Sequence, residues 1–183
     1  ANQGCEIITN VPDVALTADV HLAEFIQILI NLSVNGLHAM AGKGKLVLGA
    51  SRGEAVTQTC GFRAENFSPD KPHVRFTVAD TGSGIPAENL AHIFEPFFTT
   101  KGKGKGTGLG LATVYGIVQQ HRGWIEVISK PGEGTTFLIF LPGTEQAAPA
   151  AVSSAPHPPE IGGGRETILL VEDEPGLREL GRM

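Results

Sequence analysis

Cysteine is scarce in this chain of 183 residues, which has only Cys5 and Cys60. The two lie far apart and in no CxxC or Cys/His spacing, so the sequence supports neither a zinc site nor a disulfide framework. A reducing cytosol is therefore the natural compartment. Signal peptides and apolar runs long enough to span a bilayer are also missing. Both ends of the sequence look cut, so this absence speaks only for this piece, and the parent protein is free to be membrane-anchored.

Basic residues are too few for a general nucleic-acid binder. The chain has 14 Lys and Arg against 19 Asp and Glu, and its net charge is -5 at pH 7, whereas domains that bind nucleic acids are typically basic. The lysines cluster in one glycine-rich stretch, which suits a small anionic ligand. Hydrophobic residues make up 41% of the chain, enough for the core of one ordinary domain.

The apolar pattern predicts an α/β fold, a two-layer sandwich of three helices on a mixed, mostly antiparallel sheet of five or six strands. The helices are expected at about residues 21–40, at residues 86–94 and directly after the glycine-rich stretch. The polar segment from Gln58 to Pro72 is expected to be a hairpin loop. Strands are expected at residues 5–11, 46–53, 73–80, 124–130 and 135–142.

Composition divides the chain into three parts. Residues 1–142 are expected to form the core domain. Residues 143–165 are rich in Ala, Pro, Ser and Gly without periodicity, as in a linker. Order resumes in residues 166–183 with an apolar strand, acidic residues and the start of a helix, which together are too short to bury a core.

The stretch from Phe94 to Gly116, FEPFFTTKGKGKGTGLGLATVYG, indicates phosphate binding. Its glycines let the backbone approach an anion closely. Lys101, Lys103 and Lys105 add positive charge, and the following helix offers free N–H groups at its N-terminus. A flexible linker would have the glycines but neither the lysines nor the abrupt change into a patterned helix.

A second group of polar side chains lies on the long predicted helix. Gln27, Asn31 and Asn35 are spaced at i, i+4 and i+8, and His38 follows, so all four share one face between apolar positions. One interpretation is a solvent-exposed polar stripe, although such stripes more often carry Lys and Glu. The other is a hydrated Mg²⁺ bound to the carbonyl oxygens of Asn31 and Asn35, because magnesium takes hard oxygen ligands and keeps waters.

Two shorter motifs are ambiguous when taken alone. DTGSGIP begins at Asp80, whose carboxylate can read an exocyclic amino group such as that of adenine, while Gly82 and Gly84 let the ring lie against the backbone. Asp-Thr-Gly is also a common turn after a strand. Thr135 and Thr136 open the last predicted strand, where threonine usually reflects only β-propensity.

Together and in this order, the motifs resemble the catalytic ATP-binding domain of sensor histidine kinases, a branch of the family that includes gyrase, Hsp90 and MutL ATPases. The resemblance covers residues 5–142. The N-box is matched by QILINLSVNGLHAM, the F-box by FEPFFTTK, and the glycine boxes by DTGSGIP, GTGLGL and GEGTTF. It implies a Bergerat-type ATP-binding fold and a place in bacterial two-component signalling and phosphorelay.

The resemblance also implies roles for individual residues. Asn35 would be the principal Mg²⁺ ligand with Asn31 beside it, and Asp80 would read adenine with Thr136 supporting that contact through water. The lysine- and glycine-rich segment would be a lid over the triphosphate. His38 departs from the pattern, in which an aspartate is usual. The implied ATP-binding residues are Asn31, Asn35, His38, Asp80, Gly82, Gly84, Ile85, Phe98, Thr99, Lys101, Gly106, Thr107, Gly108, Leu109, Gly110, Leu111 and Thr136.

One position separates a kinase from a hydrolase. In the hydrolytic branches, a glutamate four residues before the magnesium asparagine serves as general base for water. Here that position is Asn31, whose carboxamide cannot take a proton at neutral pH. The site therefore suits a kinase that passes phosphate to a separate nucleophile. None of the six histidines has the family's phosphoacceptor context, so the acceptor helix is expected upstream of Ala1.

The tail resembles the opening of a response-regulator receiver domain, with the strand ILLVE followed by acidic residues. Receivers bind Mg²⁺ through an acidic pair after the first strand, matched here by Glu172 and Asp173. The whole sequence is therefore expected to be part of a hybrid sensor histidine kinase, truncated at both ends and inactive without its phosphoacceptor helices. The expected partners are the phosphoacceptor dimerisation domain of the same homodimeric protein and a receiver or cognate response regulator, with no nucleic acid. The alternatives are a nucleotide-sensing module without phosphotransfer and a gyrase-type hydrolase.

Overall fold

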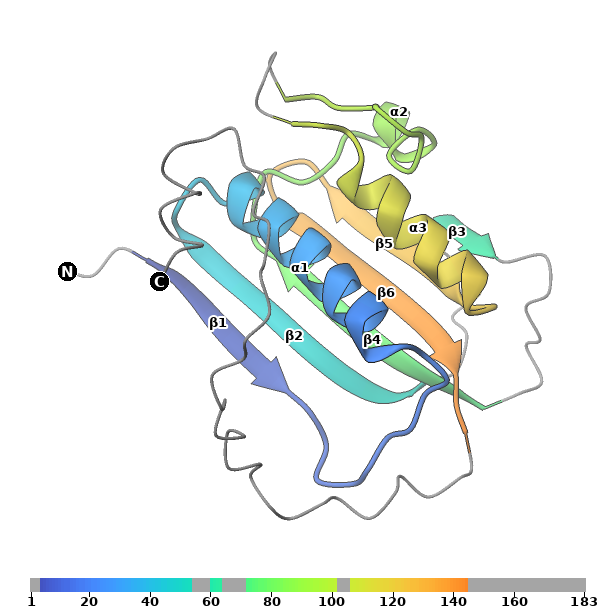
Figure 1. Cartoon of the computed structure of the whole chain (residues 1–183). Coiled ribbons are helices and arrows are strands. Elements are labelled where there is room, and N and C mark those ends of the chain that lie inside the picture. The colour runs from blue at the N-terminus through green and yellow to red at the C-terminus, as the bar shows by residue number, and fades with distance from the viewer. Residues whose placement is uncertain (1–3, 54–59, 64–71, 102–105, 145–183) are drawn as a thin grey trace, which may run out of the picture. The chain divides into compact units, whose positions relative to one another are not determined.

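The computed structural model of this chain describes residues 4–53, 60–63 (backbone only), 72–101 and 106–144. The linker and the receiver-like segment, with Glu172 and Asp173, lie outside these ranges, as do Lys103 and Lys105 of the predicted lid. The described residues form six strands and three helices (Figure 1). No helix in these ranges is long and apolar enough to cross a bilayer.

The strands form one mixed sheet in the order β1-β2-β4-β6-β5-β3. β1 pairs in parallel with β2, and the other described pairs are antiparallel. The predicted fold class, helices on a mixed and mostly antiparallel sheet, is confirmed. The strand bounds are β1 Cys5–Asn10, β2 Gly44–Gly53, β3 Cys60–Arg63, β4 His73–Asp80, β5 Trp124–Lys130 and β6 Gly134–Pro142.

The two longer helices lie side by side on one face of this sheet (Figure 1). α1 buries Ile28, Leu32 and Gly36 against the sheet, and α3 buries Val114 and Val118. In both helices the buried residues recur every three or four positions, which places them on a single stripe. The helix bounds are α1 Leu22–Ala39, α2 Ala87–Leu90 and α3 Gly110–Gln120.

Contacts at both ends show that α1 and α3 run antiparallel. In the first turn of α1, Glu24 Oε2 lies 2.6 Å from Nε2 of His121, which follows the last residue of α3. This hydrogen bond lowers the pKa of Glu24, and a carboxylate is also favoured at a helix N-terminus. At the other end, Gly110 begins α3 close to Asn31 and Asn35 of α1.

The prediction of a hairpin loop over residues 58–72 is wrong for residues 60–63, which form β3. This strand pairs antiparallel with β5 at the edge of the sheet. Its sequence, CGFR, has no extended alternation that would mark a strand, so pairing with a neighbouring strand decides its conformation. The second helix is also shorter than predicted, since only residues 87–90 are α-helical.

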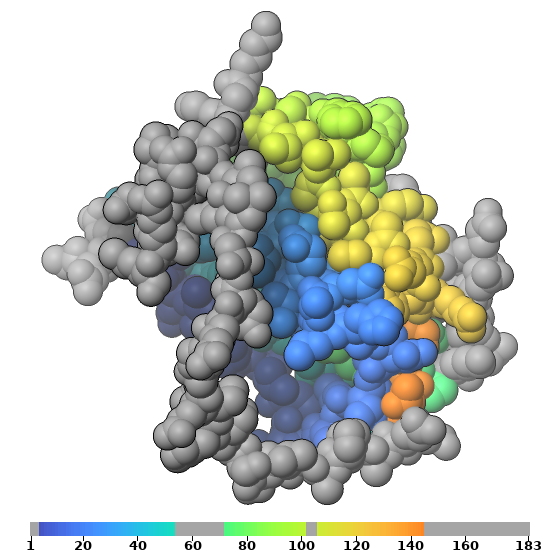
Figure 2. All heavy atoms as spheres, in the orientation of Figure 1, coloured from blue at the N-terminus to red at the C-terminus, as the bar shows by residue number. Residues whose placement is uncertain are grey.

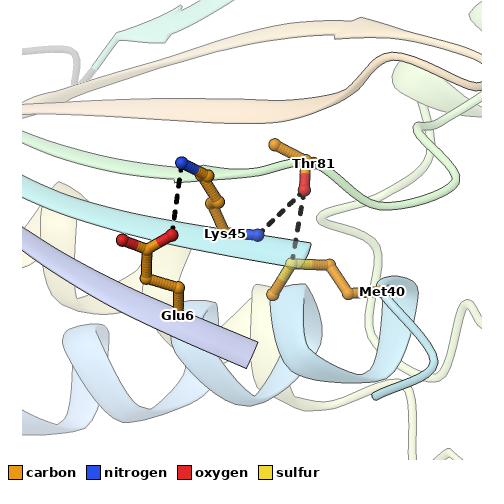
Figure 3. Close-up of polar contacts among 4 residues, drawn as sticks. All are labelled: Glu6, Met40, Lys45 and Thr81. Atoms are coloured by element: carbon orange, nitrogen blue, oxygen red, sulfur yellow. Dashed lines mark hydrogen bonds and ion pairs between the residues drawn. The ribbon is translucent and has the colours of Figure 1, made fainter. Parts of the chain in front are cut away.

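The C-terminal end of α1 is tied to β2 and to the turn after β4 (Figure 3). Thr81 Oγ1 accepts a hydrogen bond from the backbone N–H of Lys45 at 3.0 Å and donates one to Met40 Sδ at 3.7 Å. The Lys45 side chain pairs with Glu6 of β1 at 3.2 Å. Four segments thus meet here and hold the turn that begins at Asp80 beside the end of α1.

At the opposite end of α1, the last residue of β6 and the residues after it pair with the segment that precedes the helix. The Asp19 N–H donates to the Pro142 carbonyl at 3.0 Å, and the Thr144 N–H donates to the Thr17 carbonyl at 3.0 Å. The last described residues therefore lie beside the N-terminal end of α1.

Candidate functional site

A cavity of about 810 Å³ is bounded by the C-terminal half of α1, the end of β4, the start of β6 and the start of α3. Figure 2 shows α1 (blue) and α3 (yellow) adjoining on the face that carries both helices. Most of the predicted ATP-binding residues lie in the wall of this cavity. These are Asn31, Asn35, His38, Asp80, Gly84, Ile85, Phe98, Thr99, Lys101, Gly106, Thr107, Gly108, Gly110 and Leu111.

The asparagines of α1 face the cavity because the helix uses one side for the core and the neighbouring side for polar groups. Gln27 Nε2 donates to Asn31 Oδ1 at 3.2 Å, and Lys101 Nζ donates to Asn35 Oδ1 at 3.4 Å. Asn31 and Asn35 are both cavity-lining residues. They are therefore not part of a simple solvated stripe, which was one of the two interpretations of the sequence.

Asp80, the last residue of β4, lies in the cavity wall opposite Gly36 of α1. Burial raises the pKa of its carboxyl, although hydrogen bonds from the backbone N–H groups of Gly82 and Thr135 act in the opposite direction. The Gly82 N–H lies 2.8 Å from Asp80 Oδ1. A partly buried carboxylate held by two N–H groups is a fixed acceptor for a ligand's donor.

The closeness of α1 to Asp80 depends on Gly36. A Cβ at position 36 would lie 3.1 Å from Asp80 Cβ and 3.1 Å from Leu46 Cδ1. The sequence prediction gave Gly36 no role. The available signal was a glycine in the interior of a predicted helix, where it is unfavourable by about 1 kcal/mol relative to alanine and usually has a packing reason.

In the structure, the threonine that lies beside Asp80 is Thr135 and not Thr136, which was the predicted residue. Thr135 is paired with Asp80 across β6 and β4, is 3% exposed and lines the cavity. Thr136 pairs with Ala79 instead, and it belongs to the other face of the sheet because successive residues of a strand alternate.

Two further predicted residues lie outside the cavity wall. Gly82 contacts the end of α1, where an added Cβ would be 2.7 Å from the Ala39 carbonyl carbon, so its small size serves helix packing. Leu109 precedes α3 and is 42% exposed. Of the two glycines proposed to lie against a ring, only Gly84 lines the cavity.

Ser129 of β5, which was not predicted as a site residue, holds the segment after β4 in place at Ile85. Its Oγ accepts a hydrogen bond from the Ile85 N–H at 2.8 Å and lies 2.9 Å from Thr135 Oγ1. The other missed residues are mostly small or apolar, and most lie inside the quoted motifs without having been assigned a role there. Those that line the cavity are Ile30, Val34, Gly36, Ala39, Ser83, Pro86, Asn89, Ile93, Thr100, Thr135 and Phe137.

Groups that attract anions gather where α1 meets α3. A Cβ at Gly110, the first residue of α3, would lie 3.8 Å from both Asn31 Oδ1 and Asn35 Nδ2, so the free N–H groups of this helix N-terminus lie near the amides. Lys101 adds a positive charge at Asn35. This part of the cavity can bind phosphate groups.

A metal ion at this site would have to be bound largely through amide and ligand oxygens. Among the described residues, no group of three or more His, Cys, Asp or Glu side chains could hold one. The carbonyl oxygens of Asn31 and Asn35 are hard donors of the kind that Mg²⁺ accepts while retaining waters and phosphate oxygens. These two residues therefore fit a hydrated Mg²⁺.

Residues 21–145 match the model of the family described as histidine kinase-, DNA gyrase B- and HSP90-like ATPases. This chain belongs to that ATPase family. Its curated relatives include the sensor kinase CckA of Brucella abortus (strain 2308), which is 44% identical over 163 residues, or 86% of this chain and 17% of the relative. The sensor histidine kinase ZraS of Escherichia coli (strain K12) is 40% identical over 116 residues, or 63% of this chain and 21% of the relative. The chain thus spans about a fifth of the length of these relatives.

Solved structures of histidine kinases share the fold of this chain. Full-length ShkA in complex with AMPPNP is similar with a TM-score of 0.61 and 31% identity, over 80% of this chain and 27% of that protein. The nucleotide-free catalytic domain of ThkA is similar with a TM-score of 0.57 and 28% identity, over 75% of this chain and 80% of that domain. The chain is therefore homologous to the ATPase catalytic domains of sensor histidine kinases.

Asp80→Asn should stabilise the nucleotide-free protein at neutral pH. Burial raises the pKa of Asp80 in the folded chain, so the folded state binds this proton more tightly than the unfolded state. The contribution of Asp80 to stability is then greatest at low pH and is lost as the pH rises through the raised value. In thermal unfolding experiments, the variant should melt above the wild type near neutral pH, and the difference should shrink in acid. Asp19→Asn, the same change at an exposed site, is the control for the substitution itself, and a destabilised Asp80→Asn at neutral pH would contradict this account.

Proposed function

We propose that this chain is the ATP-binding catalytic domain of a hybrid sensor histidine kinase, which transfers the γ-phosphate of ATP to a histidine outside this sequence. The observation that carries the proposal is the cavity itself, in a chain of this ATPase family. It combines the partly buried acceptor Asp80, the amides Asn31 and Asn35, and a helix N-terminus beside Lys101. The related kinase ShkA was solved in complex with AMPPNP.

In this proposal adenine lies at Asp80 and the phosphates lie at the start of α3. Asp80 accepts a hydrogen bond from the 6-amino group of adenine, and Thr135 with Ser129 fixes that side of the cavity. Gly106, Thr107 and Gly108, together with the free N–H groups of α3, surround the phosphates. Asn35, with Asn31, binds Mg²⁺, which when present neutralises charge on the phosphate oxygens.

Transfer to a separate nucleophile is favoured over hydrolysis because the described residues on the phosphate side of the cavity include no carboxylate that could act as the base for water. Asp80 is the one carboxylate among the described residues of the cavity wall, and it is assigned to adenine. Asn31, at the position where hydrolytic relatives have a glutamate, is a carboxamide whose oxygen already accepts a hydrogen bond from Gln27. A general base has to accept a proton, and an amide cannot do so at neutral pH.

For the remainder of the chain, we propose a linker over residues 143–165 and the start of a receiver domain over residues 166–183, with Glu172 and Asp173 as part of its Mg²⁺ site. The family match ends at residue 145, but the similarity to CckA covers 86% of the chain and so must extend beyond that point. The parent protein would be a homodimer that supplies the phosphoacceptor helices and works with a receiver or a cognate response regulator.

Asp80→Asn should weaken ATP binding about ten- to hundredfold, because hydrogen bonds to charged groups contribute roughly 1.5–3 kcal/mol. Wild-type protein should bind GTP poorly, since guanine has no 6-amino donor. Titration calorimetry with ATP and GTP measures both effects, and Asp19→Asn serves as the matched control. Equal affinity of the wild type for the two nucleotides would refute the adenine assignment.

Asn35→Ala should remove the magnesium dependence of ATP binding without unfolding the protein, because the side chain faces the cavity and not the core. ATP affinity is compared by calorimetry in Mg²⁺ and in EDTA. Asn89→Ala, at another amide of the cavity wall, should keep the difference between the two conditions. If the wild type binds ATP equally well in both, Asn35 is not a magnesium ligand.

Phosphotransfer distinguishes the kinase from a nucleotide-sensing module that only binds ATP. The chain is incubated with γ-labelled ATP and the separately produced phosphoacceptor domain of its parent protein. Labelling of that domain, lost in Asn35→Ala, is the expected result. Binding without any transfer would support the sensing module, whereas steady ATP turnover by the chain alone would support the hydrolase.

A further inference from the structure

Lys101 is held over the cavity by two groups of α1. Its ammonium nitrogen lies 3.0 Å from His38 Nδ1 and 3.4 Å from Asn35 Oδ1. His38 and Asn35 lie in the last two turns of α1, whereas Lys101 is the last residue of the F-box segment, 63 residues further along the chain than His38. The side chain of Lys101 therefore connects this segment to the end of the helix.

The chemistry of the contact fixes the state of the histidine. An ammonium group has three donors and no acceptor, so Nδ1 of His38 must offer its lone pair. The imidazole is then neutral, with its proton on Nε2. The C-terminal end of a helix also carries partial negative charge, which favours a cation at this position.

The two contacts leave the charge of Lys101 unneutralised. No ion pair found between the described residues includes Lys101, and both of its partners are neutral. An aspartate at position 38 would instead pair with the ammonium and cancel its charge locally. A neutral acceptor holds the lysine in position while leaving its full charge for an anion.

We propose that His38 is a positioning residue, which holds the Lys101 ammonium where it meets the phosphates of the bound nucleotide. This inference rests on the proposed function, since it assumes that phosphates occupy the side of the cavity beside α3. When the phosphates bind, their oxygens take the place of Asn35 as a partner of Lys101, because the contact with Asn35 is the longer of the two. Asn35 Oδ1 then becomes free to face Mg²⁺, while His38 retains the lysine.

The test compares ATP with adenosine, which lacks phosphates, as ligands of the full chain. His38→Phe keeps a ring of similar size without the acceptor nitrogen and should weaken ATP binding about three- to tenfold, the size of one ordinary hydrogen bond, because His38 is exposed and acts on the ligand only through Lys101. Its adenosine affinity should match that of the wild type. His38→Asn restores an acceptor at the same number of bonds from Cα and should recover most of the ATP affinity. His38 is exposed, so these changes leave the core intact, and melting temperatures check this.

The dependence on Lys101 is tested by a double-mutant cycle. Lys101→Met should weaken ATP binding, and adding His38→Phe to it should have no further effect if His38 acts through Lys101. The role of His38 would be overturned if the effects of His38→Phe and Lys101→Met were additive, or if His38→Phe weakened adenosine binding as much as ATP binding. It would also be overturned if His38→Phe bound ATP as well as the wild type does, or if His38→Asn did not recover ATP affinity. A wild-type chain that binds neither ligand would refute the proposed function instead, which keeps the two failures distinct.

Discussion

The close approach of α1 to the end of β4 is the constraint on which the site depends. Between Gly36 and Asp80 there is no room for a side chain larger than hydrogen without a shift of neighbouring atoms. This contact sets the depth at which the helix lies on the sheet, and therefore where the amides of Asn31 and Asn35 enter the cavity. The Thr81 hydrogen bonds to Lys45 and Met40 hold the same end of the helix from the other side.

The site also illustrates why functional positions conflict with stability. A leucine at position 31 or 35 would favour the helix more than asparagine does, and burial opposes the ionised form of Asp80. The stabilising contributions come from elsewhere, from the buried stripe of α1 and from the sheet beneath it. Proteins commonly carry residues at their functional sites that disfavour the local structure, and packing in the core offsets the lost stability.

Much of the fold could be predicted from the sequence, because it is encoded in local periodicity. The 3.6-residue pattern of α1, the alternation of β4 and the apolar run of β6 are visible without a structure. β3 was missed since its four residues become a strand only through pairing with β5. The choice between Thr135 and Thr136 depends on a register of one residue, which two adjacent threonines leave undetermined. The contact of His38 with Lys101 joins distant parts of the chain, so neither helix periodicity nor motif spacing could reveal it.

The pairing of Thr17 with Thr144 has a consequence for how such a domain can be built into larger proteins. The chain leaves its last described strand beside the N-terminal end of α1. Asn35 lies thirteen residues further along that helix, at a separation of about 20 Å for a rise of 1.5 Å per residue. Thr144 and the cavity therefore lie at opposite ends of α1. Evolution can exchange or lengthen whatever is joined after Thr144 without altering the residues of the cavity.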